Sequence, residues 1–322
     1  MKKYIKLVIG IAFTAVFLFL SYKGVGELDF RKVFTYPLNY LLIPLSALFF
    51  VLAHWFRSLA WSRGLNKRLR TAGVFRAVCM GTATNMVMPF RMGEAVRVAA
   101  LGQAYKDIDQ EKDKALYYKA GTNSVAERLV DGTIFVFLAA AMVFFVDFEA
   151  EVTRKIYWLR NLILAGIPAG ILAFGIFRHL WLNHKLRFKW VEKVFSVAEE
   201  MALVNSPGVI VSVIGYLLTA WLCVYICIVI GLLSVGVASA KVLPIALTVL
   251  IMTNLAVLLP AVPGGIGVFE YACIYSLGLF GISGIQAAVS AILLHLIQYM
   301  ALLPLGLYFC ITSKIWRSMP KG

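Results

Sequence analysis

The stretch L-L-P-A-V-P-G-G-I-G-V-F-E, residues 258–270, decides how this sequence folds. It is apolar enough to lie inside a membrane, yet it contains two prolines and three glycines and ends on Glu270. Proline cannot donate a backbone hydrogen bond, and glycine adopts conformations that other residues avoid, so a helix must break here. Backbone left unpaired at membrane depth is tolerated only where it is buried in protein or lines a wet cavity. We therefore expect a backbone-lined site that includes Gly264, Gly265 and Glu270; the alternative is a simple turn at the membrane surface.

The composition places the whole chain in a membrane. Of its 322 residues, 61% are hydrophobic, and the mean hydropathy is +0.84. A soluble domain of this length is nearer half apolar. We predict an all-α integral membrane protein with a single polytopic domain over residues 1–322. Basic cytoplasmic loops and anionic lipid head groups account for the net charge of +15, so no nucleic acid partner is expected.

Several apolar segments approach the ~20 residues that cross a bilayer. The first is interpreted as a spanning helix and not as a signal peptide, because no small-residue cleavage site follows it. The segments cover residues 5–21, 39–61, 74–104, 129–147, 156–177, 208–234, 243–280 and 285–312.

The basic residues determine the predicted topology. They cluster at both termini, after the second segment and after the fifth, and the positive-inside rule places all four clusters in the cytoplasm. This requires the segment at 74–104 to enter and leave on the cytoplasmic side as a hairpin. The segment at 243–280 then enters and leaves from the opposite side. The prediction is about six full crossings and two oppositely oriented re-entrant helical hairpins, with both termini cytoplasmic and an amphipathic cytoplasmic segment at 178–206.

The two interrupted segments resemble each other. One reads T-N-M-V-M-P-F-R-M-G-E over 84–94, and the other begins with T-N at 253 and reaches its glutamate at 270. Broken helices at corresponding places of opposite topology are typical of inverted-repeat transporters and mark their binding sites. We therefore expect repeat-like halves at 1–147 and 156–312, with Asn85 and Asn254 at the site; chance similarity is the alternative.

Charged residues inside apolar segments form the rest of the predicted site. A charge at bilayer depth costs roughly 2.5–3.5 kcal/mol on insertion scales, so it is paired or functional. In the functional interpretation, arginines bind a lipid phosphate and carboxylates bind a cationic head group or a proton. These residues are Arg91, Glu94 and Arg97, then Ser124, Glu127, Arg128 and Asp131, and finally Glu270.

Two structural alternatives stay open for these charges. Arg91 or Arg97 can pair with Glu127 or Asp131 and simply hold two segments together. The group at 124–131 can also be a solvated helix end, since we expect 105–119 to be a wet loop. His54 and His295 are expected to be packed or hydrogen-bonded helix residues. The sequence contains no recognisable phosphate loop, nucleophile motif or zinc pattern, so we expect no enzyme activity, no cofactor and no metal.

Three motifs together resemble the membrane domain of the lysylphosphatidylglycerol synthase/flippase family. The first is N-x-x-x-P-x-R-x-G-E-x-x-R, from Asn85 to Arg97; the second is S-x-x-E-R-x-x-D, from Ser124 to Asp131; the third is P-x-x-P-G-G-I-G-x-x-E, from Pro260 to Glu270. They occur in the order found in the family and extend over most of the chain.

The resemblance implies a lipid flippase that moves aminoacylated phosphatidylglycerol or a related lipid across the bacterial inner membrane. The chain resembles stand-alone members, because full-length members continue into an aminoacyl-transferase domain and this chain stops at Gly322. The alternative is a membrane accessory or scaffold for a lipid-modifying synthase or glycosyltransferase. A lipid-synthase partner and a homo-oligomer are both compatible with the sequence.

Overall fold

A computed structural model places helices throughout the part of the chain that it describes. That part comprises residues 12, 14–23, 30–64, 70–88, 92–106, 113–146, 148, 154, 160–161, 207–237, 241–257 and 263–313, and it contains no strand. The predicted segment at 156–177 lies almost entirely outside the described residues, and the amphipathic segment at 178–206 lies wholly outside them. The helices are α2 (Phe30–Phe34), α3 (Leu42–Gly64), α4 (Thr71–Val87), α5 (Gly93–Lys106), α6 (Asp113–Phe145), α10 (Pro207–Ser234), α11 (Val242–Ala256), α12 (Val268–Gly278) and α13 (Gly284–Thr312), with a short 3₁₀ turn, η1, at Pro263–Gly265.

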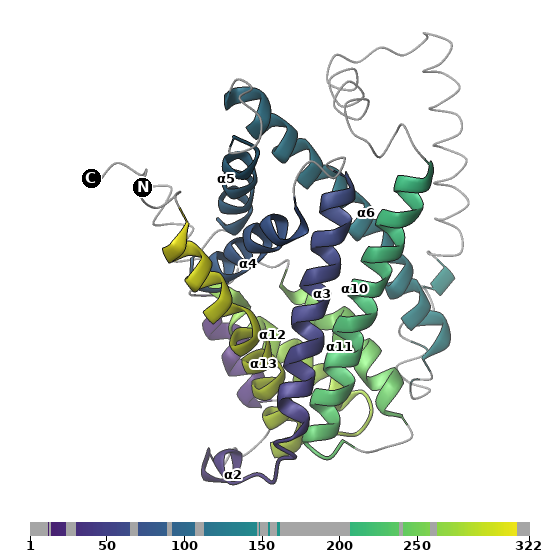
Figure 1. Cartoon of the computed structure of the whole chain (residues 1–322). Helices are drawn as coiled ribbons and strands as arrows, with labels where there is room; N and C mark the ends of the chain where they lie inside the picture. Colours follow the sequence, from purple (N-terminus) through teal and green to yellow (C-terminus); the bar gives the residue numbers. More distant parts are fainter. Residues whose placement is uncertain are drawn as a thin grey trace.

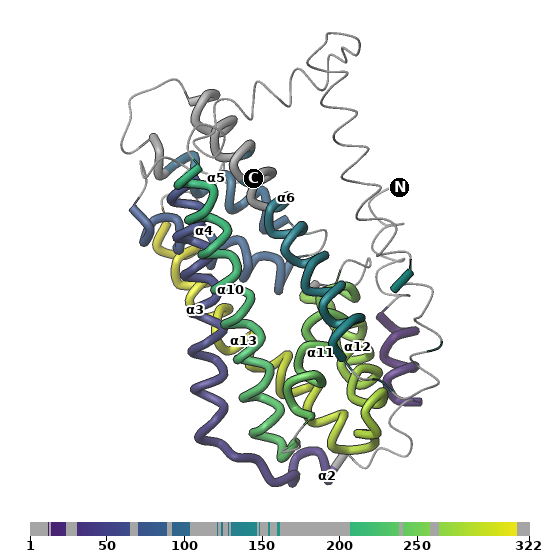
Figure 2. Tube along the Cα trace, turned by 90° about the vertical axis from the view of Figure 1, so that its right-hand side faces the viewer, coloured from purple at the N-terminus to yellow at the C-terminus, as the bar shows by residue number. Residues whose placement is uncertain are grey.

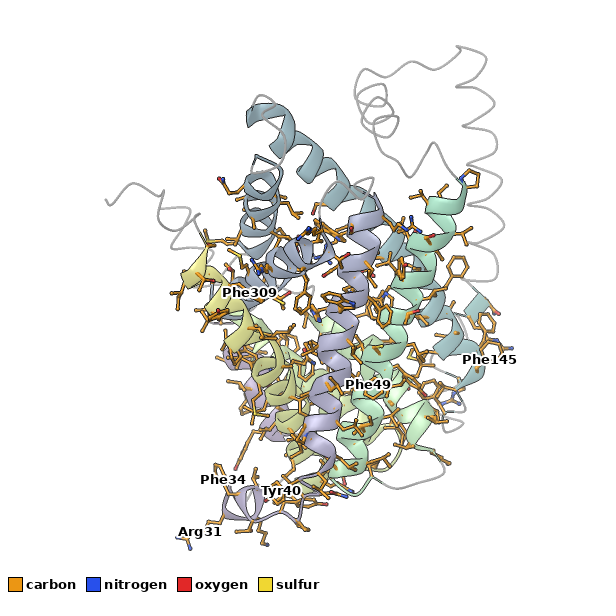
Figure 3. The ribbon with its side chains drawn as sticks, in the orientation of Figure 1. Arg31, Phe34, Tyr40, Phe49, Phe145 and Phe309 are labelled. Carbon is orange, nitrogen blue, oxygen red and sulfur yellow. The ribbon has the colours of Figure 1, made fainter. Side chains whose placement is uncertain are left out.

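The helices confirm the all-α membrane class. Three of them, α3, α10 and α13, are long and apolar enough to cross a bilayer, and α11 is a shorter apolar helix. Their outward faces remain apolar: the exposed fractions of Leu48 on α3, Val211 on α10 and Ile311 on α13 are 52%, 70% and 74%. Exposed aromatic residues Phe34 and Tyr40 lie at the α2 end of the molecule (Figure 3), as expected where a membrane protein meets the interface.

Two antiparallel helices, α3 and α10, form the central pair (Figure 1). The backbone N–H of Asn39 donates to the carbonyl of Ser234 at 2.8 Å, and Ser46 donates to the carbonyl of Cys227 at 2.7 Å. Low residue numbers on α3 therefore meet high residue numbers on α10. The C-terminal ends of α3 and α10 therefore lie at opposite ends of the molecule.

Two helical hairpins follow these two ends. The α4–α5 pair comes directly after α3 and lies at the end of the molecule where α3 finishes, whereas α11–α12 follows α10 and lies toward the α2 end (Figure 1). The predicted breaks are confirmed, because α4 ends at Val87 and α5 begins at Gly93, and η1 interrupts the second hairpin.

The two hairpins meet at their tips. The turn η1 packs against α4. The hydroxyl of Tyr299 on α13 donates to the carbonyl of Met86, one residue before α4 ends, at 3.4 Å. Gly264 in η1 has φ of +73°, and a Cβ placed there would lie 3.3 Å from the Met86 carbonyl oxygen. Glycine is needed here both for the backbone conformation and for the close approach.

Small residues allow the hairpin helices to pack closely. A Cβ on Gly81 of α4 would lie 2.7 Å from the carbonyl oxygen of Gly93 in α5. The amide of Gly93 donates to Oδ1 of Asn85 at 2.8 Å, so the asparagine closes the first hairpin across its break. Gly306 makes a similar close approach from α13 to Cys79 of α4. Such contacts between small residues are the usual way in which membrane helices associate.

The helix α6 is longer than the sequence predicts. It runs obliquely across the molecule (Figure 2) and contacts α3, α5, α10 and α11. The prediction of a wet loop over 105–119 is wrong at both ends, because α5 continues to Lys106 and α6 already begins at Asp113. The stretch D-K-A-L-Y-Y-K at 113–119 is rich in helix formers and starts with an acid, which favours a helix N-terminus. Ser124 and Asp131 therefore lie within a helix and not at its start.

Candidate functional site

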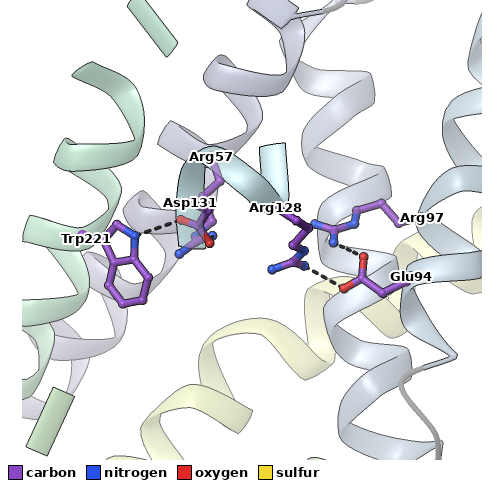
Figure 4. Close-up of polar contacts among 6 residues, drawn as sticks. All are labelled: Arg57, Glu94, Arg97, Arg128, Asp131 and Trp221. Carbon is purple, nitrogen blue, oxygen red and sulfur yellow. Dashed lines mark hydrogen bonds and ion pairs between the residues drawn. The ribbon is translucent and has the colours of Figure 1, made fainter. Parts of the chain in front are cut away.

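Six side chains from four helices form a charged cluster (Figure 4). Arg128 and Asp131 lie one turn apart on α6, and each belongs to one half of the charged cluster. One half reaches α3 and α10, and the other reaches α5. The cluster consists of Arg57, Glu94, Arg97, Arg128, Asp131 and Trp221.

Asp131 forms the buried half of the charged cluster. Its Oδ2 accepts a hydrogen bond from Nη1 of Arg57 at 2.7 Å, and its Oδ1 accepts one from the indole N–H of Trp221 at 2.8 Å. The Arg57 guanidinium lies 5.2 Å from the centre of the Trp221 ring. Both carboxylate oxygens are thereby satisfied, which is what a buried charge requires. The arrangement ties α3, α6 and α10 together at one point.

Glu94 forms the more open half. It lies in the first turn of α5, bonds to Arg97 one turn later, and accepts a hydrogen bond from Nη2 of Arg128 at 2.7 Å. Arg97 is buried, with its guanidinium 4.6 Å from the centre of the Trp61 ring. The side chains of Arg128 and Glu94 are 47% and 38% exposed. This half can therefore be reached by a ligand, whereas the Asp131 half cannot.

The charges of the cluster favour an anionic ligand group. Its described members supply three guanidinium groups and two carboxylates. Guanidinium groups bind phosphate oxygens through paired hydrogen bonds, and they are always charged. The exposed guanidinium of Arg128 suits a phosphate or phosphodiester, and Glu94 beside it suits an ammonium group on the same ligand.

An apolar groove of about 490 Å³ borders the charged cluster. It lies between α6 and α10. Val130 of the groove directly precedes Asp131, and Leu218 lies one turn before Trp221. Phe137 is 61% exposed, so the groove opens to the outside of the protein. The groove is lined by Val130, Thr133, Ile134, Phe137, Leu138, Ile214 and Leu218.

A second cluster forms at the tip of the α11–α12 hairpin, and we call it the tip cluster: Gly264, Glu270 and His295. One ring nitrogen of His295, Nδ1, lies 2.6 Å from Oε1 of Glu270, and the other, Nε2, lies 3.0 Å from the carbonyl oxygen of Gly264. The backbone N–H of Gly267 donates to Oε2 of Glu270 at 2.6 Å. Helix α12 begins at Val268, directly after Gly267, and its own Glu270 caps this N-terminus.

The structure divides the predicted site residues between two places. Glu94, Arg97, Arg128 and Asp131 meet in the charged cluster, and Gly264 and Glu270 meet in the tip cluster. No hydrogen bond or ion pair joins the two clusters within the described part of the chain.

The remaining predicted residues lie around these clusters. Asn85 closes the first hairpin, whereas Asn254 donates from Nδ2 to the carbonyl of Leu250, one turn back in α11. Gly265 is buried with φ of +76°, and Ser124 is buried within α6. Arg91 and the side chain of Glu127 lie outside the described residues.

In the structural alternative, Asp131 pairs with Arg91 or Arg97; the structure does not pair it with Arg97, which bonds to Glu94, and Arg91 lies outside the described residues. Asp131 pairs with Arg57, which was not among the predicted site residues. The signal for Arg57 was its position as a charge within an apolar segment, but its partner is 74 residues away and cannot be read from spacing. Trp221 carried no such signal. The expectation that His54 and His295 are hydrogen-bonded helix residues is confirmed, since His54 contacts the Phe50 carbonyl and His295 contacts Glu270.

Comparison with known proteins identifies a family for this chain. The family model described as the lysylphosphatidylglycerol synthase TM region matches residues 7–306. No curated protein and no solved structure matches the chain. The matched range includes both hairpins, the charged cluster and the tip cluster. The chain therefore belongs to the family of the lysylphosphatidylglycerol synthase transmembrane region.

Proposed function

We propose that this protein is a lipid translocase that moves a phospholipid with a charged head group across the bacterial inner membrane. Aminoacylated phosphatidylglycerol or a related lipid is the proposed cargo. The observation that carries the proposal is the position of the apolar groove beside the charged cluster, along the same helix α6. A phospholipid has the same division into a charged head and apolar chains.

Each part of such a lipid has a matching surface. The phosphodiester binds at Arg128, whose side chain is half exposed and whose guanidinium can donate paired hydrogen bonds to phosphate oxygens. The ammonium group of an aminoacylated head lies near Glu94. One acyl chain occupies the groove between α6 and α10, whose outward opening lets the chain remain continuous with the bilayer.

The hairpins supply the proposed route. Both are re-entrant, enter from opposite faces of the membrane, and leave about six helices to cross it fully, with both termini in the cytoplasm. Support comes from the opposite placement of the two hairpins and from the contact between their tips. Opposed broken helices that meet near the middle of the bilayer are the arrangement used by alternating-access transporters.

The test is head-group transfer in proteoliposomes that contain the purified protein. Lysyl-phosphatidylglycerol is placed in the inner leaflet, and a membrane-impermeant amine reagent measures its arrival outside. Arg128→Gln is expected to slow transfer by roughly tenfold, the effect of losing one charged hydrogen bond. Arg31→Gln, at an exposed arginine of α2 outside both clusters, is the matched control and should transfer like the wild type.

Two outcomes would contradict the proposal. Unchanged transfer by a folded Arg128→Gln variant would remove the charged cluster from the lipid site. No transfer by the wild type, together with a lipid-modifying enzyme bound at fixed stoichiometry, would favour a scaffold over a translocase. Correct folding of each variant is checked by gel filtration and helical content.

A further inference from the structure

His295 lies between two hydrogen-bond acceptors. Its Nδ1 is 2.6 Å from the Glu270 carboxyl group, and its Nε2 is 3.0 Å from the carbonyl oxygen of Gly264. Two aromatic rings fix the imidazole in this orientation. The ring of Phe269 stacks on it with 4.4 Å between ring centroids, and the ring of Tyr299 packs edge-on with 5.1 Å between centroids. The His295 and Glu270 side chains are only 9% and 16% exposed.

This geometry requires one more proton than a neutral imidazole and a carboxylate contain. The Gly264 carbonyl can only accept, so Nε2 must carry a hydrogen. A neutral imidazole then has no hydrogen left for Nδ1. The short contact to Glu270 therefore needs a second proton, held either on Nδ1 or on the carboxyl group. The requirement follows from counting donors and acceptors and holds for either position of the shared proton.

Loss of that proton removes one of the two contacts. If Nε2 keeps its hydrogen, the lone pair of Nδ1 faces a carboxylate oxygen and the two repel. If the hydrogen moves to Nδ1, Nε2 no longer donates and the Gly264 carbonyl loses its partner. In a buried site an unpaired polar group is costly, so the side chain or the tip must move.

The contact at risk holds the tip of the second hairpin. Gly264 lies in η1, which packs against α4, and Tyr299 from the same face of α13 donates to the Met86 carbonyl. Residues of α13 thus touch the tips of both hairpins. A change at His295 alters how the second tip is held against the first.

The neighbouring titratable groups do not supply an alternative proton. Cys273 and Tyr299 interact electrostatically with Glu270, and neither carries a charge in its ordinary form. Helix α11 has no titratable side chain. In the other helices packed on α13, Arg57 pairs with Asp131 and His54 contacts the Phe50 carbonyl, both on α3. Arg76 of α4 lies over Phe309, and the basic residues of α2 are exposed. On α10, which also contacts α13, the titratable side chains are Tyr216, Cys223, Tyr225 and Cys227.

We propose that His295 and Glu270 form a proton-binding site whose shared proton ties the tip of the α11–α12 hairpin to α13, and that its release frees the tip. This inference goes beyond lipid translocation and is tested without any transport assay. It gives the second hairpin a ligand of its own, a proton, distinct from the lipid head group assigned to the first.

The test is hydrogen exchange of the backbone amides at 264–267 in the full chain in lipid nanodiscs, measured across a range of pH. Rates are corrected for the intrinsic pH dependence of exchange. The wild type is expected to show a step in the corrected rate, roughly tenfold or more, where the shared proton is lost. ¹⁵N NMR of His295 should show its two ring nitrogens changing at the same pH as that step.

Two variants give opposite expected results. Glu270→Gln keeps the shape of the protonated acid, because its amide NH₂ can donate to Nδ1 while its oxygen accepts from Gly267, so the tip should exchange slowly at every pH. His295→Phe removes both contacts but preserves packing, so the tip should exchange rapidly at every pH. A wild type with no step, or a Glu270→Gln variant with the wild-type step, would overturn the proposal.

Discussion

The two hairpins share a plan and differ in their partners. Each carries Thr-Asn near the end of its first helix and a glutamate in the first turn of its second helix. Glu94 of the first hairpin faces two arginines and is partly open, whereas Glu270 of the second faces a histidine and caps its own helix. The same backbone motif therefore presents a fixed positive surface in one half and a proton-dependent contact in the other.

Replacing a carboxylate in each cluster should give the largest loss of stability. The loss should be larger in the charged cluster than in the tip cluster. Asp131→Leu removes the carboxylate that pairs with the buried, permanently charged Arg57, which costs about 3–5 kcal/mol of stability. Glu270→Leu leaves His295, which can lose its charge, and should cost only about 1–3 kcal/mol. Thermal unfolding in detergent measures both. The double variant Arg57→Leu/Asp131→Leu should recover most of the loss, and equal losses from the two single variants would contradict the distinction.

Disturbing the packing of the first hairpin should give the next largest loss of stability. A Cβ on Gly93 would lie 2.5 Å from Oδ1 of Asn85, so Gly93→Ala should destabilise the protein by about 1–3 kcal/mol through overpacking. Gly73 lies in the same hairpin with nothing within 4 Å of its would-be Cβ, and Gly73→Ala is the matched control. Similar melting temperatures for the two variants would show that α4 and α5 do not pack as described.

Replacing the asparagine of each hairpin should give a smaller difference in stability between the two hairpins. Asn85 bridges the break of the first hairpin to Gly93, whereas Asn254 only bonds back to Leu250 within its own helix. Asn85→Ala should cost about 1–3 kcal/mol because it leaves the Gly93 amide unpaired, and Asn254→Ala about 0.5–1 kcal/mol. Unfolding in urea measures the loss of stability in each variant. A larger loss for Asn254→Ala than for Asn85→Ala would contradict the roles assigned to the two asparagines.

The sequence predicted the parts of this structure that depend on local chemistry. Prolines and glycines near 89 and 263 set the breaks, because they restrict the backbone wherever they occur. The start of α6 was missed because its polar first turns read as a loop, although they contain helix formers. The pairs Arg57–Asp131 and His295–Glu270 join residues 74 and 25 positions apart, so only the folded chain brings them together.

The lipid site is the central claim, and the lipid that co-purifies with the protein tests it most directly. Mass spectrometry compares the wild type with Arg128→Gln, which alters the charged cluster, and Leu218→Trp, which fills the apolar groove. We predict that the wild type retains an anionic or aminoacylated phospholipid and that each variant loses most of it while remaining folded. The same bound lipid in all three proteins, or none in the wild type, would contradict the account.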